Sequence, residues 1–240
     1  MSATQPVRAP RRRAPRNSLN TERILDAAIT LLDRDGTEAF TMRALAEQLG
    51  VGTMAVYSHF RGKEEIADAV AQRLLETIEL PPPGDDPVGE LRAVCRQVYQ
   101  LFTDHPSALQ LLTVRPLRGD DAISVIDRML ALLCRAGLTG PEAACAHVAL
   151  MQYTVGSALW NIRRARALCE EGMRERMRAK FAALPADRYP SLVALAPELN
   201  RAHDDGPGQY EVGLDALLAG VLGAPGRDVG DDVGHHGCPG

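Results

Sequence analysis

The side chains best suited to contact another molecule are gathered in a short segment between Phe40 and Lys63. Two short helices joined by a tight turn are predicted there. The second helix keeps short, polar or adaptable side chains on its outer faces, namely Thr53, Met54, Ala55, Tyr57, Ser58 and His59. A helix that enters the major groove of DNA needs such side chains near its N-terminal end, where backbone N–H groups also attract phosphates. The segment therefore predicts a pair of helices joined by a turn, of which the second contacts DNA.

Local signals at the helix ends position these two helices. Three predicted helices begin with a capping residue between two apolar residues that lie five positions apart, an arrangement known as a hydrophobic staple. The three sets are Leu19, Asn20 and Ile24; Phe40, Thr41 and Leu45; and Val51, Gly52 and Val56. Gly36 and Gly50 follow the first two helices, where a residue that accepts a left-handed conformation ends the helix at little cost. Apolar residues recur on one face of each helix, so a small three-helix core is expected.

The pattern Leu49-Gly50-Val51, then four residues, then Val56-Tyr57 and His59-Phe60 resembles the TetR family of bacterial transcription regulators. The likeness spans Thr21 to Val70, the full DNA-binding head of that family. It implies that one set of residues contacts bases and another contacts phosphates. The base-contacting set is Arg43, Thr53, Met54 and Ala55, and the phosphate-contacting set is Thr41, Tyr57, His59 and Lys63.

Six of these eight assignments have a plainer alternative. Arg43 either pairs with guanine, which would contribute about 1 to 3 kcal/mol of discrimination, or is an ordinary solvated arginine. Met54 and Ala55 suit thymine methyl groups, but a helix start also accounts for Thr53 and partial burial for the other two. Tyr57 and His59 either meet phosphates or cover the three-helix core.

Charge is distributed unevenly along the 240 residues, whose formal net charge is −4. Residues 1–20 hold five arginines and no acid, whereas residues 21–80 hold six basic and eleven acidic residues. We expect residues 1–18 to be a disordered basic arm. Three interpretations stand for it: an arm that follows phosphates or reaches a minor groove, a merely solubilising tail, or an artefact of the assigned translation start.

The composition argues against several classes of protein. No apolar run approaches the roughly 18 to 20 residues of a membrane span, and no secretory signal is present, so a cytoplasmic protein is expected. Five cysteines without a CxxC pair argue against a disulfide framework. Neither Cys145 with His147 nor the tail residues His235, His236 and Cys238 supply a zinc site, so no metal and no cofactor are expected. The chain shows no nucleophile motif or phosphate loop, which argues against an enzyme.

The remainder of the chain predicts a larger helical body. A connecting helix over residues 63–80 completes the head, residues 19–80, and the Pro-rich stretch 81–87 interrupts helix. The body, residues 85–223, is expected to contain helices over 88–103, 107–114, 120–136, 141–167 and 210–222. The polar stretch 168–208, which contains four prolines, predicts short helices mixed with loop, and residues 224–240 predict a disordered tail.

A second, looser resemblance covers most of the body. Arg115-Pro116, Leu133-Cys134 with Gly137, Thr154-x-Gly156 with Leu159, and Gly213-Leu214 resemble the C-terminal domain of tetracycline repressors. In that subfamily the long helix and the final helix pair with their dimer mates in a four-helix bundle, and each body binds a small molecule. The resemblance therefore implies a homodimer with a ligand pocket.

The candidate pocket residues are aromatic, large or polar side chains on the body helices. They are Tyr99, Phe102, Leu111, His147, Met151, Tyr153 and Trp160, and ordinary core packing is the alternative for each. Leu111 and Trp160 occupy the places of a histidine and a glutamate that bind drug-bound magnesium in tetracycline repressors. Neither can ligate magnesium, so Mg-tetracycline is not expected as the effector and an apolar or aromatic ligand is favoured.

The sequence thus predicts an all-α protein, with a helix-turn-helix head and a larger ligand-binding and dimerisation domain. The expected function is a ligand-responsive repressor that a small effector releases from a palindromic, double-stranded DNA operator. Recognition helices must reach successive major grooves about 34 to 36 Å apart, so a small change in their separation would release DNA. The alternatives are an effector-independent DNA-binding protein and, with less support, an all-helical enzyme.

Overall fold

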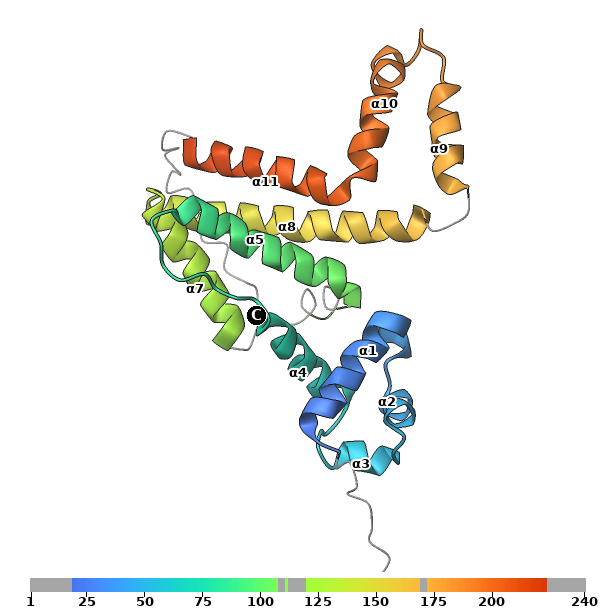
Figure 1. The fold of residues 1–240 in the computed structure, drawn as a ribbon, viewed down its shortest axis with the longest axis vertical. Coiled ribbons are helices and arrows are strands. Elements are labelled where there is room, and N and C mark those ends of the chain that lie inside the picture. The colour runs from blue at the N-terminus through green and yellow to red at the C-terminus, as the bar shows by residue number, and fades with distance from the viewer. Residues whose placement is uncertain (1–18, 108–110, 112–119, 169–171, 224–240) are drawn as a thin grey trace, which may run out of the picture. The chain divides into compact units, whose positions relative to one another are not determined.

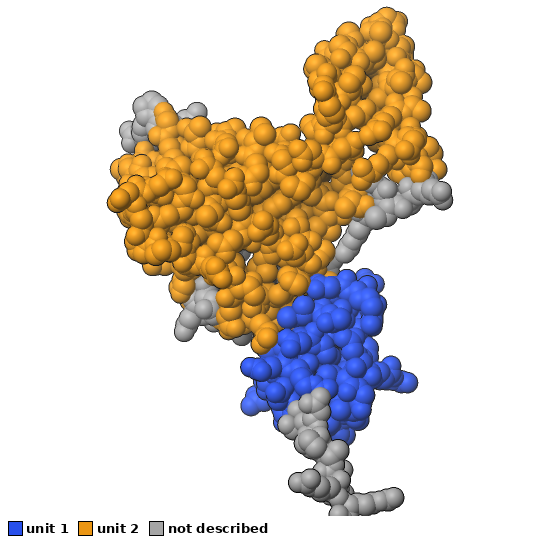
Figure 2. Space-filling model, in the orientation of Figure 1, with its two compact units in different colours: residues 1–67 blue, residues 68–240 orange. Residues whose placement is uncertain are grey.

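The chain forms two compact units, residues 1–67 and residues 68–240 (Figure 2). The computed structural model describes residues 19–107, 111, 120–168 and 172–223; the predicted arm, the predicted tail and most of the predicted helix 107–114 lie outside these ranges. All regular secondary structure in the described ranges is helical, which confirms the all-α prediction. No described helix combines the length and the apolar character that a membrane crossing requires.

Four helices account for the head and its connection to the body (Figure 1). They are α1 (Thr21–Ala39), α2 (Met42–Leu49), α3 (Thr53–Tyr57) and α4 (Lys63–Leu75), the last of which crosses the boundary between the units. Asn20 caps α1 by accepting a hydrogen bond from the Arg23 backbone N–H at 2.9 Å. Gly50 ends α2 in the left-handed conformation, with φ of 66°, as the sequence predicts.

The core of the head is built around the staple residues. Ile24, Leu45 and Val56, one from each of the first three helices, are completely buried. The Gln48 side-chain amide of α2 donates to the Ala27 carbonyl of α1 at 2.9 Å, which fixes the angle between these helices. Gly36 breaks α1 with φ of 81°, but the chain then resumes a helical course to Ala39 instead of ending there.

Six helices form the described part of the body. They are α5 (Pro87–Asp104), α7 (Asp120–Arg135), α8 (Gly140–Leu168), α9 (Met173–Ala182), α10 (Pro190–Asp204) and α11 (Gly206–Gly223). Helices α5, α7 and α8 pack against one another, and α11 runs along α8 (Figure 1). Their core contains the completely buried side chains of Leu91, Met129, Leu150 and Leu214.

The structure differs from two of the helix predictions. The connecting helix ends at Leu75 rather than at residue 80, because Thr77 and Ile78 are β-branched and Thr77 donates its hydroxyl to the Leu74 carbonyl at 2.6 Å. The stretch 168–208 is more helical than expected. Pro190 stands in the first turn of α10, where proline is tolerated, and α10 continues through Pro197.

A cluster of charged residues fastens the Pro-rich connector to the body. The Glu90 carboxylate of α5 lies 2.6 Å from Arg128 and 3.5 Å from Arg135, both on α7. The same two arginines donate to connector carbonyls, Arg128 to Pro81 at 2.8 Å and Arg135 to Gly84. The connector between α4 and α5 is therefore held by the helix whose N-terminal half lines the cavity described below.

Candidate DNA-binding surface and body cavity

The outer side chains of α3 are available to a partner molecule. Met54 is 78% exposed and Tyr57 is 45% exposed, whereas Val56 between them is completely buried. His59 is also exposed, and Thr53 and Ala55 are half-buried. The buried Val56 and the exposed Met54 and Tyr57 therefore lie on different faces of α3, one that packs in the core and one that is available to contact DNA.

The remaining predicted contact residues flank α3 on neighbouring elements. Thr41 is exposed, and its hydroxyl oxygen accepts the α2 capping bond from the Ala44 backbone N–H at 3.1 Å. That bond uses an oxygen lone pair and leaves the hydroxyl hydrogen free to be donated elsewhere. The Arg43 side chain is 85% exposed and lies 3.0 Å from Glu47, and Lys63 is exposed at the first position of α4.

A cavity of about 300 Å³ lies inside the body. It is lined by the end of α4, the turn that follows it, and the inner faces of α5, α7 and α8. The lining residues are Leu75, Ile78, Val98, Phe102, Ala122, Val125, Ile126, His147, Met151 and Val155. The structure thus brings together three of the predicted pocket residues, Phe102, His147 and Met151.

His147 is the polar member of this described lining. Its Nδ1 atom is buried and has no hydrogen-bond partner among the described residues. Burial lowers the pKa of the imidazole below its ordinary value, because a charged ring is poorly solvated there. His147 is therefore a neutral group at pH 7, with one nitrogen that can donate and one that can accept.

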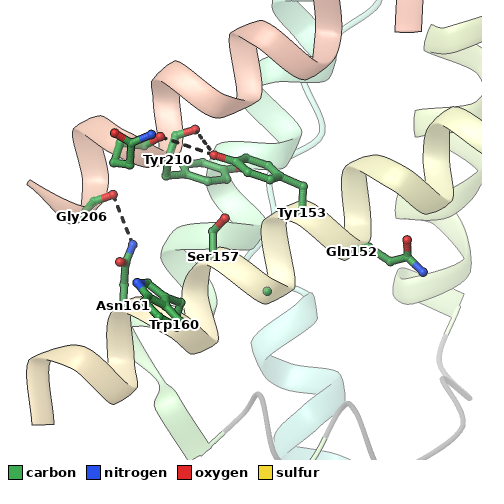
Figure 3. A pocket seen from close by; sticks show the side chains of 9 residues that line it. Gln152, Tyr153, Ser157, Trp160, Asn161, Gly206 and Tyr210 are labelled. Atoms are coloured by element: carbon green, nitrogen blue, oxygen red, sulfur yellow. Dashed lines mark hydrogen bonds between the residues drawn. The ribbon is translucent and has the colours of Figure 1, made fainter. Parts of the chain in front are cut away.

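Tyr153 and Trp160 lie outside this cavity and line a separate hollow between α8 and α11 (Figure 3). Trp160 is 61% exposed. Tyr99 borders a third hollow and stacks on Tyr210, with ring centroids 3.9 Å apart. Leu111 is half-buried, and the residues on both sides of it lie outside the described ranges.

The tyrosines join α5, α8 and α11 by hydrogen bonds. Tyr153 donates its hydroxyl to the Tyr210 carbonyl at 3.0 Å, and Tyr210 donates its own to the Cys95 carbonyl at 2.9 Å. Asn161 donates to the Tyr99 hydroxyl at 2.7 Å and to the Gly206 carbonyl at 3.2 Å, the latter bond being drawn in Figure 3. The contacts of Tyr99 and Tyr153 with neighbouring helices are those of packed side chains, which is the alternative to a pocket role given above.

The sequence did not identify the aliphatic side chains of the cavity wall. Leu75, Val98, Ile126 and Val155 follow the same helical periodicity as ordinary core residues, and nothing in that pattern marks an unfilled space beside them.

Comparison with known proteins finds family models that match both parts of the chain. The family model for bacterial regulatory proteins of the tetR family matches residues 24–70, and that for the tetracyclin repressor-like C-terminal domain matches residues 80–224. The chain is 30% identical over 217 residues to the HTH-type transcriptional repressor DrrR1 of Streptomyces coeruleorubidus, covering 87% of this chain and 79% of that protein. It is 29% identical over 210 residues to the class C tetracycline repressor of Escherichia coli, covering 85% and 91% of the two chains.

A solved structure shows the same architecture. ActR from Streptomyces coelicolor in complex with actinorhodin superposes with a TM-score of 0.75 and 26% sequence identity. The match covers 89% of this chain and 100% of that chain.

Proposed function

This chain belongs to the TetR family of bacterial regulatory proteins and is a helix-turn-helix transcriptional regulator, and we propose that it represses transcription as a homodimer until a small effector releases it from its operator. The observation that carries this proposal is the pairing of an exposed α3 surface in the head with an apolar cavity in the body. In this role the protein binds its operator and its effector and catalyses no reaction.

The α3 surface supports the base-contacting and phosphate-contacting roles. Met54 and Ala55 would meet base edges from α3, and Arg43 would reach them from the start of α2. Among the described residues the Arg43 guanidinium pairs with the exposed Glu47, and such a pair contributes little to stability and can be exchanged for guanine. Thr41, Tyr57, His59 and Lys63 would position the head on phosphates.

Exposed apolar side chains on α8 and α11 support the homodimer. Val148, Leu159 and Trp160 on α8 and Val212 on α11 are large, apolar and exposed, with Val212 at 65%. In tetracycline repressors the corresponding helices pair with their dimer mates, and apolar groups gathered on such faces are typical of association sites. A dimer also presents two heads, as a palindromic operator requires.

The cavity supports an effector-responsive protein over an effector-independent one. Its lining is apolar apart from His147. Leu75 is the last residue of α4, the helix that begins in the head at Lys63, and Ile78 lies just beyond its end. A ligand that contacts this helix end differently in two conformations would change operator affinity, and DNA would change ligand affinity by the same factor. The complex of ActR with actinorhodin supports a small-molecule effector for this chain. The side chains of Leu111 and Trp160 argue against Mg-tetracycline, since neither supplies a magnesium ligand.

A gel-shift titration on the DNA upstream of the chain's own coding region tests the proposal. We expect specific competitor, but not scrambled DNA, to remove the shifted band, and a screen of apolar and aromatic compounds to find some that release it. Equal competition by scrambled DNA would contradict sequence-specific repression. Release by none of the compounds that bind the body would favour the effector-independent alternative.

A further inference from the structure

We infer that the effector is a compact aromatic molecule bearing a neutral hydroxyl group, and that this hydroxyl pairs with the buried imidazole of His147. The inference rests on the proposed function, in which the cavity of the body is the effector site. It adds the chemical class of the ligand and the residue that selects it.

The Nδ1 atom of His147 is the polar group in the cavity that a ligand can engage. This atom is buried without a hydrogen-bond partner among the described residues. A buried nitrogen without a protein partner is unfavourable, so a ligand that supplies a hydrogen bond gains an interaction that the described side chains do not offer. The other side chains of the described lining are aliphatic, aromatic or, at Met151, a thioether, and none offers a strong competing hydrogen bond.

The position of His147 on α8 sets the orientation of such a ligand. His147, Met151 and Val155 recur every fourth residue, so they form one stripe along the helix facing the cavity. A hydroxyl held at His147 would place the attached rings along Met151 and Val155. Met151 can contact a ring edge through its sulfur, and Phe102 of α5 is the aromatic group in the same lining.

The protonation state of His147 selects a hydroxyl over a charged group. Burial lowers the pKa of the imidazole, which disfavours the charged ring that would pair with a carboxylate in the cavity. A carboxylate would also lose part of its hydration there, and no other side chain of the described lining carries a positive charge to compensate. A hydroxyl both donates and accepts, so it satisfies Nδ1 in either tautomer of the ring.

Equilibrium dialysis of the full-length protein against three matched probes tests the inference. The probes are naphthalene, 2-naphthol and 2-naphthoate at pH 7. We expect 2-naphthol to bind about fivefold more tightly than naphthalene, as one net hydrogen bond allows, and 2-naphthoate to bind more weakly than either. His147→Leu should abolish the preference for 2-naphthol while retaining naphthalene. His203→Leu, the same substitution beside the separate hollow that Tyr99 borders, should leave the preference unchanged.

Three results would overturn the inference: equal binding of naphthalene and 2-naphthol by the wild type, an undiminished preference in His147→Leu, or failure of both probes to bind. His147→Gln, which keeps a polar group at the site, should retain part of the preference, and its complete loss in that folded variant would also contradict a hydrogen-bonding role. Operator release is measured on the same samples. Probe binding that depends on His147 without release of DNA would refute the proposed regulation but leave the hydroxyl site intact.

Discussion

Substitution of Thr41 separates the capping bond that the structure shows from the phosphate contact that we propose for the same hydroxyl group. The Thr41 oxygen caps α2 by accepting from the Ala44 backbone N–H, and its hydrogen remains available to an operator phosphate. Thr41→Ala should lower the free energy of unfolding of the head by about 1 kcal/mol, because the cap is lost. Thr41→Asp keeps a capping acceptor and should preserve stability, but it replaces the donor with a negative charge.

The expected effect on DNA is much larger than the effect on folding. A hydrogen bond to a charged group contributes about 1.5 kcal/mol or more, so losing it at both half-sites of a dimer predicts about 100-fold weaker operator binding by Thr41→Asp. Thr41→Ser keeps both the acceptor and the donor and should bind nearly as the wild type does. The assay is fluorescence anisotropy with a labelled operator at fixed salt, beside urea denaturation of each variant.

Asn20→Asp provides the matched control for added charge. Asn20 caps α1 through the same kind of bond, to the Arg23 backbone N–H, and is not predicted to touch DNA. Asn20→Asp should therefore weaken operator binding far less than Thr41→Asp. Equal losses in the two variants would refute the phosphate contact and leave Thr41 as a cap alone.

Three further substitutions test the base contact of Arg43, the ion pair that holds the connector, and the burial of His147. Arg43→Ala should change the free energy of unfolding by less than about 0.5 kcal/mol, since the pair with Glu47 is exposed. It should nevertheless lower the ratio of operator affinity to scrambled-site affinity about tenfold or more. An unchanged ratio in a competition assay would show that Arg43 is an ordinary solvated arginine. Glu90→Gln should destabilise the body by about 3 kcal/mol in urea, because it leaves the largely buried Arg128 without its carboxylate, and a loss below about 1 kcal/mol would contradict the clamp on the connector. Burial lowers the pKa of His147 in the folded protein, so the unfolded chain takes up a proton at this residue more readily, and the free energy of unfolding should fall as the pH drops below about 6.5. His147→Leu should flatten this fall. The same pH profile in the variant and the wild type would contradict the burial of the ring.

The head could be predicted closely because its signals are local. Asn20, Thr41 and Gly50 act on backbone groups within a few residues of themselves, so a short stretch of sequence contains both partners of each interaction. The staple residues, such as Leu45, became core for the same reason. Local signals were insufficient in the body, where α10 runs through Pro197 despite the unfavourable residue in its interior.

The cavity could be predicted only in part because it depends on distant packing. Phe102, His147 and Met151 were identified by residue type, but Val155 has no property that distinguishes a cavity wall from filled core. Tyr153 was placed in the pocket by type as well. Its hydroxyl instead bonds the carbonyl of Tyr210, 57 residues later in the chain, and no periodicity within α8 reveals that partner.

Operator and effector are proposed to bind to one protein at linked sites. The direct measurement is the affinity of the full chain for its operator with the cavity empty and with it saturated by a compound shown by dialysis to occupy it. The same compound's affinity is then measured with and without operator. We expect operator and effector each to weaken the binding of the other by one common factor well above unity. A factor of one for every compound that occupies the cavity would contradict this linkage.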